Sequence, residues 1–473
     1  ESNVQYIKYL VNREITERFI NGTLDSSLDE IAEKLVPGPK PATRCCIYKE
    51  RHIIKERAKN AIYPQTKDNV ISILHDACDE CPVNRFMITE ACRGCLGHRC
   101  QEVCPRNAIF MVNHHAYINQ ELCIECGRCK EVCPFNAISD VKRPCIRSCE
   151  IGAIQIDENK KAVIDDSKCV SCGACVHQCP FGAIVDKPFV LDVLLKESEN
   201  NTKYKVYAVV APAISSQFTN ARIEQVITGI EKIGFYHAVE AALGADIVSY
   251  HEAHEFAETI EEMKWKTTSC CPAFVDYVSK KFPELMDHVS KTVSPMVATA
   301  RLIKSLDEDA KIVFIGPCTA KKMEIKKDDI KDAVDLVITF EELQALFDAR
   351  GVTIEHLEES VLDNASYYGR IFARSGGLSD AVAQALKEHG ISEEQFQANP
   401  IACDGIEECR TALFKARKNM LPNNFIEGMA CIGGWIGGAA CITHGPKDKS
   451  EVNKYGQLAK EKTILDAIAV TRI

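Results

Sequence analysis

Two cysteine runs of identical spacing carry the clearest chemistry in this sequence. Each follows the pattern C-x2-C-x2-C-x3-C-P, first at Cys123, Cys126, Cys129 and Cys133, then at Cys169, Cys172, Cys175 and Cys179. Thiolates at these intervals hold the corners of a 4Fe–4S cubane, and the fourth cysteine of one run ligates the cluster of the other. A zinc site is the alternative, but Cys-Pro closes both copies, as it closes iron–sulfur runs. The repeat therefore predicts a pair of 4Fe–4S clusters.

A second, less regular pair of runs surrounds the first. One run comprises Cys92, Cys95, Cys100 and Cys104 and closes with Pro105-Arg-Asn-Ala-Ile109. The other keeps only Cys145 and Cys149 before Gly-Ala-Ile154, and Cys78 and Cys81 can supply the two cysteines that it lacks. All sixteen cysteines between positions 78 and 179 are then used. The sequence predicts four 4Fe–4S clusters in this region.

The crossing of the fourth cysteine gives a predicted partition of these ligands. The four sets are Cys123, Cys126, Cys129 and Cys179; Cys169, Cys172, Cys175 and Cys133; Cys92, Cys95, Cys100 and Cys149; and Cys78, Cys81, Cys104 and Cys145. Because the sets are complete, the nearby histidines are expected to have surface or hydrogen-bonding roles (His98, His114, His115 and His177). Closely spaced clusters carry single electrons from the surface to a buried site, so this region is expected to feed one.

Three segments in the second half of the chain are candidates for that site. They are Thr268-Ser-Cys-Cys-Pro272, Gly316-Pro-Cys-Thr-Ala-Lys-Lys322 and Cys431-Ile-Gly-Gly-Trp435. Adjacent cysteines alone are more often apolar packing. Three such segments in this order, behind a multi-cluster region, closely resemble the active-site signatures of iron-only (FeFe) hydrogenases. The resemblance covers about residues 78–445, and it is closest to members with a cysteine-rich double-ferredoxin front end.

The resemblance implies a 4Fe–4S cubane bridged to a diiron unit that bears carbon monoxide, cyanide and a dithiolate. The positions that match cubane ligands are Cys271, Cys318 and Cys431. Cys270 matches the thiol that passes protons, Lys321 the lysine that holds a cyanide, and Glu324 a carboxylate of the proton path. The positions that match contacts of the diiron unit are Ala211, Pro212, Met429 and Trp435. Gly316 stands where the family usually has methionine and is expected to loosen the diiron pocket.

Trp435 departs from the family pattern, because it stands where the bridging cysteine belongs. An indole nitrogen is a donor only and cannot replace a thiolate. The cubane is left with three cysteines, and the diiron unit has no covalent tether. Two outcomes are open: Cys441, Cys403 or Cys409 supplies the missing ligand, or the indole ring occupies the diiron pocket.

Two functions follow from these alternatives. The first, implied by the resemblance, is reversible reduction of protons to hydrogen with electrons from ferredoxin or a similar redox partner. The second is a non-hydrogenase iron–sulfur protein that lacks the diiron unit and acts as an electron relay or redox sensor. A small-ligand site at an open iron and an iron–sulfur assembly scaffold are further options. An intact pocket favours the first function, and a pocket filled by Trp435 favours the second.

Three regions are expected to position these residues. Residues 1–75 are predicted to be a helical segment, which includes an adjacent thiol pair, Cys45-Cys46. Residues 76–190 are predicted to form a double ferredoxin-like α+β domain. Residues 200–473 alternate apolar strands with amphipathic helices, which predicts an α/β catalytic domain, two-lobed by the resemblance. The predicted strands are 204–210, 247–250, 311–315 and 336–340, and the predicted helices include 221–233 and 378–388.

The overall composition limits the partners and the compartment. The net charge of −10 is unlike that of nucleic-acid-binding proteins, which need a basic face. No apolar run reaches the roughly 20 residues of a membrane span, and no secretory signal begins the chain. The grouping of the 25 cysteines favours cluster ligation over disulfides. We therefore expect a cytoplasmic protein of anaerobic metabolism.

Overall fold

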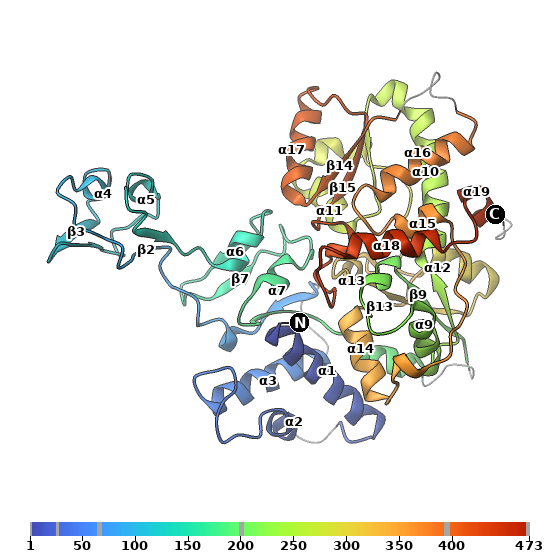
Figure 1. Cartoon of the computed structure of the whole chain (residues 1–473), viewed down its shortest axis with the longest axis horizontal. Helices are drawn as coiled ribbons and strands as arrows, with labels where there is room; N and C mark the ends of the chain where they lie inside the picture. The colour runs from blue at the N-terminus through green and yellow to red at the C-terminus, as the bar shows by residue number, and fades with distance from the viewer. Residues whose placement is uncertain (1, 25–27, 64–68, 198–202, 392–397, 470–473) are drawn as a thin grey trace.

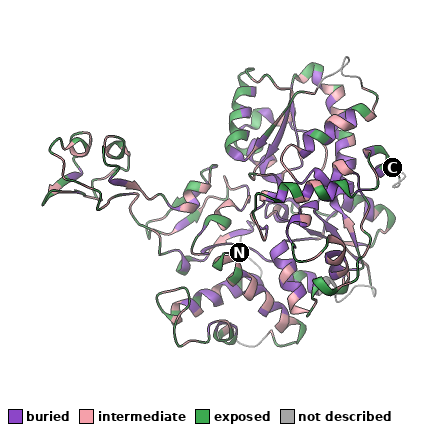
Figure 2. Ribbon diagram, in the orientation of Figure 1, coloured by how far each residue is buried: buried purple, intermediate pink, exposed green. Residues whose placement is uncertain are grey.

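Three regions are distinguishable in the computed structural model, which describes residues 2–24, 28–63, 69–197, 203–391 and 398–469 (Figure 1). A helical segment lies at the bottom of the view, and a cysteine-rich arm extends to the left. The large two-lobed domain on the right contains the candidate site. Buried residues run through both lobes, whereas the end of the arm is mostly exposed (Figure 2). The mixed helix and sheet architecture confirms the predicted fold class.

The N-terminal segment is helical, as predicted. It contains α1 (Asn3–Ile20), α2 (Leu28–Leu35) and α3 (Ile47–Ile62). Ser2 and Gln5 form a capping box at the start of α1, and the Cys46 sulfur accepts the Lys49 N–H at the start of α3. The exposed Cys46 therefore acts as a helix cap.

The cysteine-rich region consists of two ferredoxin-like units, one inserted into the other. In the proximal unit, β1 (Ile71–Ile73) pairs with β8 (Ile184–Asp186), and β6 (Ile154–Ile156) pairs with β7 (Ala162–Ile164). In the distal unit, β2 (Phe86–Ile88) pairs with β5 (Ile138–Asp140), and β3 (Ile109–Val112) pairs with β4 (His115–Ile118). The short helices are η1 (His75–Ala77), α4 (Arg99–Glu102), α5 (Arg128–Glu131), α6 (Pro144–Ser148) and α7 (Ala174–Gln178). The distal unit thus interrupts the proximal unit between Cys81 and Cys145, and it lies farthest from the two lobes (Figure 1).

Each lobe of the large domain is built on a parallel sheet. The first sheet has the order β10-β9-β12-β13, with bounds His237–Glu240, Val206–Val210, Lys311–Ile315 and Leu336–Ile338. The second has the order β11-β15-β14, with bounds Lys266–Thr267, Phe425–Met429 and Pro400–Asp404. The helices are α8 (Val190–Glu197), α9 (Ile223–Lys232), α10 (Ala241–Met263), α11 (Pro272–Lys281), α12 (Pro295–Leu306), α13 (Lys321–Glu324), α14 (Phe340–Ala349), α15 (Tyr367–Ile371), α16 (Gly377–Glu388), α17 (Ile406–Arg417), α18 (Asp448–Gln457) and α19 (Ile464–Ala469). Short 3-10 helices are η2 (Pro212–Ser216), η3 (Pro283–His288), η4 (Ile354–His356) and η5 (Trp435–Gly437).

The signature segments follow directly from strand ends. Thr268 follows β11, Gly316 follows β12, and Ala430 follows β15. Ala211 follows β9 in the same way. Because all these strands are parallel to their neighbours, their carboxyl ends bring four distant segments to one place, as in other open α/β sheets.

The strand predicted at 247–250 is wrong, because these residues lie inside α10. Helix α10 packs against α12 and α16, so it is buried over most of its length and an apolar run there has no helical period. The strand predicted at 336–340 is shorter, since Thr339 caps α14 with a capping box to Glu342. The helices predicted near 221–233 and 378–388 are confirmed as α9 and α16.

Candidate functional site

The structure groups the sixteen cysteines differently from the predicted partition. A cavity in the distal unit is lined by Cys92, Cys95, Cys100 and Cys133. In the proximal unit, burial and then the neighbouring charges of Cys179, Cys81 and Cys78 raise the pKa of Cys145 to about 11. The charge of Cys149 acts instead on Cys172 and Cys175. Cys104 remains for the set that contains Cys123, Cys126 and Cys129.

The predicted exchange between the two regular runs is therefore wrong. The prediction paired the two cysteine runs that are most alike in sequence. In the structure, the strand pairs β2–β5 and β1–β8 close the two units separately. The fourth cysteine crosses within a unit, so Cys133 joins the Cys92 set, and Cys179 joins Cys78, Cys81 and Cys145. We call this last set the inner cysteine group. Cys149 joins Cys169, Cys172 and Cys175.

The surroundings of these cysteines fit 4Fe–4S clusters. The fourth cysteine of each run accepts a backbone N–H from the alanine four residues later, as Cys104 does from Ala108 at 3.2 Å. The same contact recurs at Cys133, Cys149 and Cys179, at 3.4, 3.2 and 3.3 Å. Hydrogen bonds to cluster sulfurs are one means by which proteins set cluster potentials. Among the described residues, no three Cys, His, Asp or Glu side chains are arranged around a single metal ion.

Cys271, Cys318 and Cys431 come together at the junction of the two lobes. They line one cavity, together with Cys270, Lys321 and Met429. Burial raises the pKa of Cys318 to about 11, and the charge of Cys271 adds to the shift. Burial also raises the pKa of Cys431, with further contributions from Cys318, Cys271 and the proximal-unit residue Cys172. The three thiolates are thus placed to share a cubane beside the Cys149-containing set.

Trp435 occupies the space next to these three cysteines. It lines the same cavity as Cys271, Cys318 and Cys431. The indole ring meets Phe372 edge-on, with ring centroids 5.8 Å apart and planes at 68°. The ring therefore forms part of the wall of the cavity that the three cysteines share. Exclusion of the diiron unit by this ring stays a prediction.

None of the alternative cysteines lines this cavity. The Cys441 thiol donates to the backbone oxygen of Ile436 at 3.3 Å. The Cys409 thiol donates to the Met429 oxygen at 3.4 Å and lies beside Cys403. The structure therefore does not bring a fourth thiolate to the cubane site from any of the three.

Only some of the other predicted site residues line this cavity. Ala211 and Pro212 do not line the cavity. The expectation that Gly316 loosens the pocket is wrong, because a Cβ there would lie 2.5 Å from the Phe314 ring, which already lines the cavity. Gly316 instead gives room to that ring.

Comparison with known proteins agrees with this geometry. Residues 204–439 match the family described as the iron only hydrogenase large subunit, C-terminal domain. Residues 116–139 match a 4Fe-4S binding domain, and residues 143–183 match a 4Fe-4S dicluster domain. The chain belongs to the iron-only hydrogenase family. Its resemblance to this family, inferred from the cysteine signatures, is confirmed.

The chain is similar to three proteins of known name, among others. Iron hydrogenase 1 of Clostridium pasteurianum is 29% identical over 271 residues, which are 48% of this chain and 47% of the relative. The chain thus spans about half the length of that relative. The cytosolic Fe-S cluster assembly factor NAR1 of Kluyveromyces lactis is 38% identical over 78 residues, 16% of this chain and 17% of the relative. The apo [FeFe]-hydrogenase HydA1 of Chlamydomonas reinhardtii shares the fold, with 20% identity, a TM-score of 0.51, and coverage of 60% of this chain and 93% of that one.

Within the hydrogenase-family domain, Lys321 and Glu324 bind each other. Lys321 Nζ is 2.6 Å from Glu324 Oε2 and donates to the Cys270 backbone oxygen at 3.4 Å. The Cys270 thiol has a raised pKa, first because of burial and then because of the charges of Cys271, Glu252 and Glu427. The carboxylate predicted for proton transfer is therefore held by the lysine predicted to bind cyanide.

The sequence analysis did not identify several polar residues near Cys270. Burial raises the pKa of Glu252, on α10, to about 8. Ser290 Oγ donates to Glu255 Oε2 at 2.8 Å, and Glu255 pairs with Lys266. The only signal in the sequence was a pair of glutamates three residues apart, which lie on one face of a helix. Glu252 lies close enough to raise the pKa of Cys270, and Glu255 close enough to raise that of Glu252.

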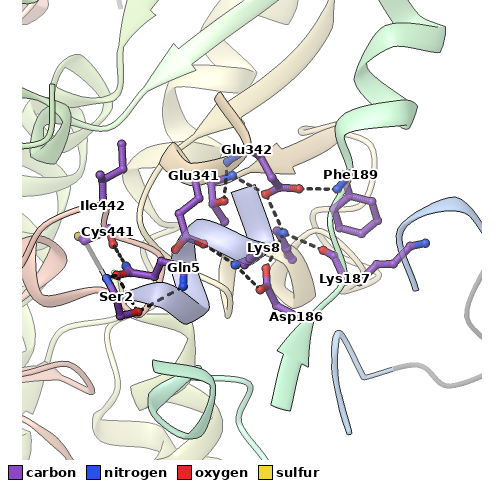
Figure 3. Close-up of polar contacts among 12 residues, drawn as sticks. Ser2, Gln5, Lys8, Asp186, Lys187, Phe189, Glu341, Glu342, Cys441 and Ile442 are labelled. Carbon is purple, nitrogen blue, oxygen red and sulfur yellow. Dashed lines mark hydrogen bonds and ion pairs between the residues drawn. The ribbon is translucent and has the colours of Figure 1, made fainter. Parts of the chain in front are cut away.

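A buried ion network holds α13 against the other regions. Lys8 of α1 lies between Asp186 of β8 and Glu341 of α14 (Figure 3). Lys322, next to Lys321, binds Asp186 at 3.0 Å and Glu342 at 2.8 Å, and its side chain is fully buried. The network therefore joins the N-terminal segment, the proximal unit and the helix that carries Lys321.

None of the helices in the described part of the chain is both long and apolar enough to cross a membrane.

Proposed function

We propose that this chain is an electron-transfer iron–sulfur protein on the hydrogenase fold, which exchanges electrons with a partner through its ferredoxin-like units and does not carry the diiron unit. The observation that supports the proposal is the position of Trp435. It lines one cavity with Cys271, Cys318 and Cys431, at the position where the family resemblance places the bridging cysteine. Without a thiolate at this position, the diiron unit has no covalent tether to the cubane, because an indole nitrogen cannot replace a thiolate.

The order of the cysteine groups supports an electron path toward the cubane site. The distal unit is the most remote and exposed part (Figures 1 and 2). The inner cysteine group lies in the proximal unit, and Cys172 of the neighbouring group lies close enough to Cys271 for the charge of Cys271 to raise its pKa. When bound, the clusters supply one-electron redox chemistry, and the chain's residues space them and exclude water. We expect a ferredoxin or a similar redox protein as the partner.

Reversible proton reduction is the second candidate function. It is supported by Cys270, Lys321 and Met429, which line the same cavity as the cubane cysteines, and by the acidic residues near Cys270. In this role the Cys270 thiol would hold and release a proton, and Lys321 would present an ammonium to an anionic ligand. That function requires the diiron unit to bind without the bridging thiolate that Trp435 replaces.

The two functions differ in a direct assay. We would load the chain with clusters, expose it to the diiron precursor, and supply electrons from chemically reduced ferredoxin. The proposal predicts that the clusters become reduced but hydrogen evolution does not exceed that of a Cys271→Ser control. Evolution well above the control would overturn the proposal in favour of the hydrogenase function. Failure of the clusters to accept electrons from ferredoxin would overturn the electron-transfer proposal itself.

A further inference from the structure

Two buried arginines flank the inner cysteine group (Cys78, Cys81, Cys145 and Cys179). Arg57 lies on α3 of the N-terminal segment and is 7% exposed. Arg143 precedes α6 in the proximal unit and is 6% exposed. By contrast, every arginine and lysine of the distal unit, residues 83–141, is at least partly exposed. The two guanidinium groups therefore distinguish one cluster site from the sites at the end of the arm.

Arg57 reaches this group from outside the proximal unit. Its Nη2 donates to the Gly182 backbone oxygen at 2.6 Å, three residues after Cys179. Burial lowers the pKa of Arg57 to about 10, and the negative charges of Asp186 and Cys179 oppose that shift. The guanidinium consequently remains protonated at neutral pH. Asp186 itself is bound by Lys8 at 2.6 Å and Lys322 at 3.0 Å.

Arg143 approaches the same group from within the proximal unit. Its Nη2 donates to the Lys160 backbone oxygen at 2.8 Å. Its positive charge opposes the rise in the pKa of Cys81 that burial causes. Arg143 and Arg57 thus act on cysteines from the two ends of the inner group, Cys81 and Cys179.

Both arginines have a buried nitrogen without a hydrogen-bond acceptor in the described part of the chain. These nitrogens are Arg57 Nε and Arg143 Nη1. Neither guanidinium forms an ion pair with a carboxylate among the described residues. Unpaired buried charge is strongly unfavourable unless an anion compensates it. A cluster held by four thiolates is such an anion, and its sulfurs are acceptors, so the orphan N–H groups fit its presence between Cys81 and Cys179.

We infer that Arg57 and Arg143 raise the reduction potential of the cluster at the inner cysteine group, which makes it the first of the four ferredoxin-type clusters to accept an electron. The inference rests on the cluster assignment within the proposed function, but not on the fate of the diiron unit. Accepting one electron makes a cluster more negative, and nearby positive charge stabilises that state. Because both charges are buried, salt screens them little. The N-terminal segment thereby contributes a charge that makes this cluster an electron reservoir between the arm and the cubane site.

Reduction of the cluster at the inner cysteine group can be detected with a spin label on an exposed native cysteine, Cys46. Cys46 caps α3, and Lys49 of the same turn binds Asp79 at 2.6 Å and Glu80 at 3.0 Å, between Cys78 and Cys81. A nitroxide on Cys46, in a Cys45→Ser background, lies nearest the inner cysteine group. Reduction of that cluster makes it paramagnetic and speeds the relaxation of the label.

The test is an anaerobic dithionite titration of the cluster-loaded full chain, followed by electron paramagnetic resonance of the clusters and the label. We expect the first electron taken up to speed the relaxation of the label. In Arg57→Gln and Arg143→Gln, the reduced-to-oxidised ratio of this cluster at a fixed potential should fall at least tenfold, equivalent to about 59 mV for one electron. Arg57→Lys should retain most of the ratio, and Arg106→Gln, exposed on the distal unit, should leave it unchanged.

Two results would overturn the inference. One is an inner cluster that becomes reduced only after the others in the unsubstituted chain. The other is an unchanged titration curve in both glutamine variants with full iron content. If a glutamine variant loses its cluster, the order of reduction in the unsubstituted chain decides the question alone. Because this titration uses dithionite instead of ferredoxin and measures no hydrogen, its failure is distinguishable from failure of the electron-transfer proposal.

Discussion

The rings of Trp435 and Phe372 meet edge-on, with centroids 5.8 Å apart. This contact places the indole against the second lobe at the point where a family member has a bridging thiolate. Aromatic pairs in this geometry contribute about 0.5–1.5 kcal/mol beyond their buried area. Trp435 therefore packs at the junction of the two lobes and also replaces a ligand.

Truncation of this ring should destabilise the large domain. We expect Trp435→Ala to lower the free energy of unfolding by about 3 kcal/mol, near the low end of the range for aromatic truncation because the side chain is partly exposed. Trp435→Phe should cost less than half as much. Denaturant unfolding can be followed by the fluorescence of Trp265, the other tryptophan, which stacks on His288 in the second lobe. Equal stability of Trp435→Ala and the unsubstituted chain would contradict the packing described here.

Lys322 should be among the most sensitive positions for folding. Lys322→Met leaves Asp186 and Glu342 short of a buried partner, and breaking such a network typically costs about 3–5 kcal/mol. Lys331→Met is the matched control, because Lys331 pairs with Asp328 on the surface and should change stability by less than about 1 kcal/mol. Thermal unfolding of the two variants makes the comparison, and similar losses would exclude a special role for the buried network.

Glu252 should make stability depend on pH. Burial raises its pKa from the ordinary 4.5 to about 8, so between these values the folded chain holds a proton that the unfolded chain has released. The stability contributed by this proton is complete below pH 4.5 and is lost as the pH rises toward 8. Glu252→Gln should therefore lose less stability than the unsubstituted chain between pH 6 and pH 8.5, as measured by denaturant midpoints. Parallel losses would place the titration elsewhere.

The revised cysteine partition also makes a distinct prediction. Cys133→Ser should remove a cluster of the distal unit, whereas Cys145→Ser should remove the cluster of the inner cysteine group. With a nitroxide on Cys46, only the second substitution should abolish the relaxation effect on the label. If Cys133→Ser instead disturbed the signal that depends on Cys169, Cys172 and Cys175, the partition predicted from the repeat would be restored.

Local motifs in this sequence predict the site well, whereas the long-range pairing of cysteines and strands is not encoded in them. The three signature segments were predicted as one site, and each follows a parallel strand whose carboxyl end leads there. The exchange of Cys133 and Cys179 was predicted wrongly, because repeat similarity says nothing about which strands close a unit. Glu252 was not identified, since its chemistry arises from burial on α10, and a strand had been predicted for 247–250 in that same helix.

We propose that Trp435, which replaces the bridging cysteine, excludes the diiron unit. The most direct test is an infrared spectrum of the cluster-loaded chain after anaerobic maturation with the diiron precursor and desalting, with Trp435→Cys treated in parallel. We predict no carbon monoxide or cyanide bands for the unsubstituted chain and retained bands for Trp435→Cys, which restores the bridging thiolate. Bands that persist after desalting in the unsubstituted chain would contradict the claim and show that the diiron unit binds beside the tryptophan.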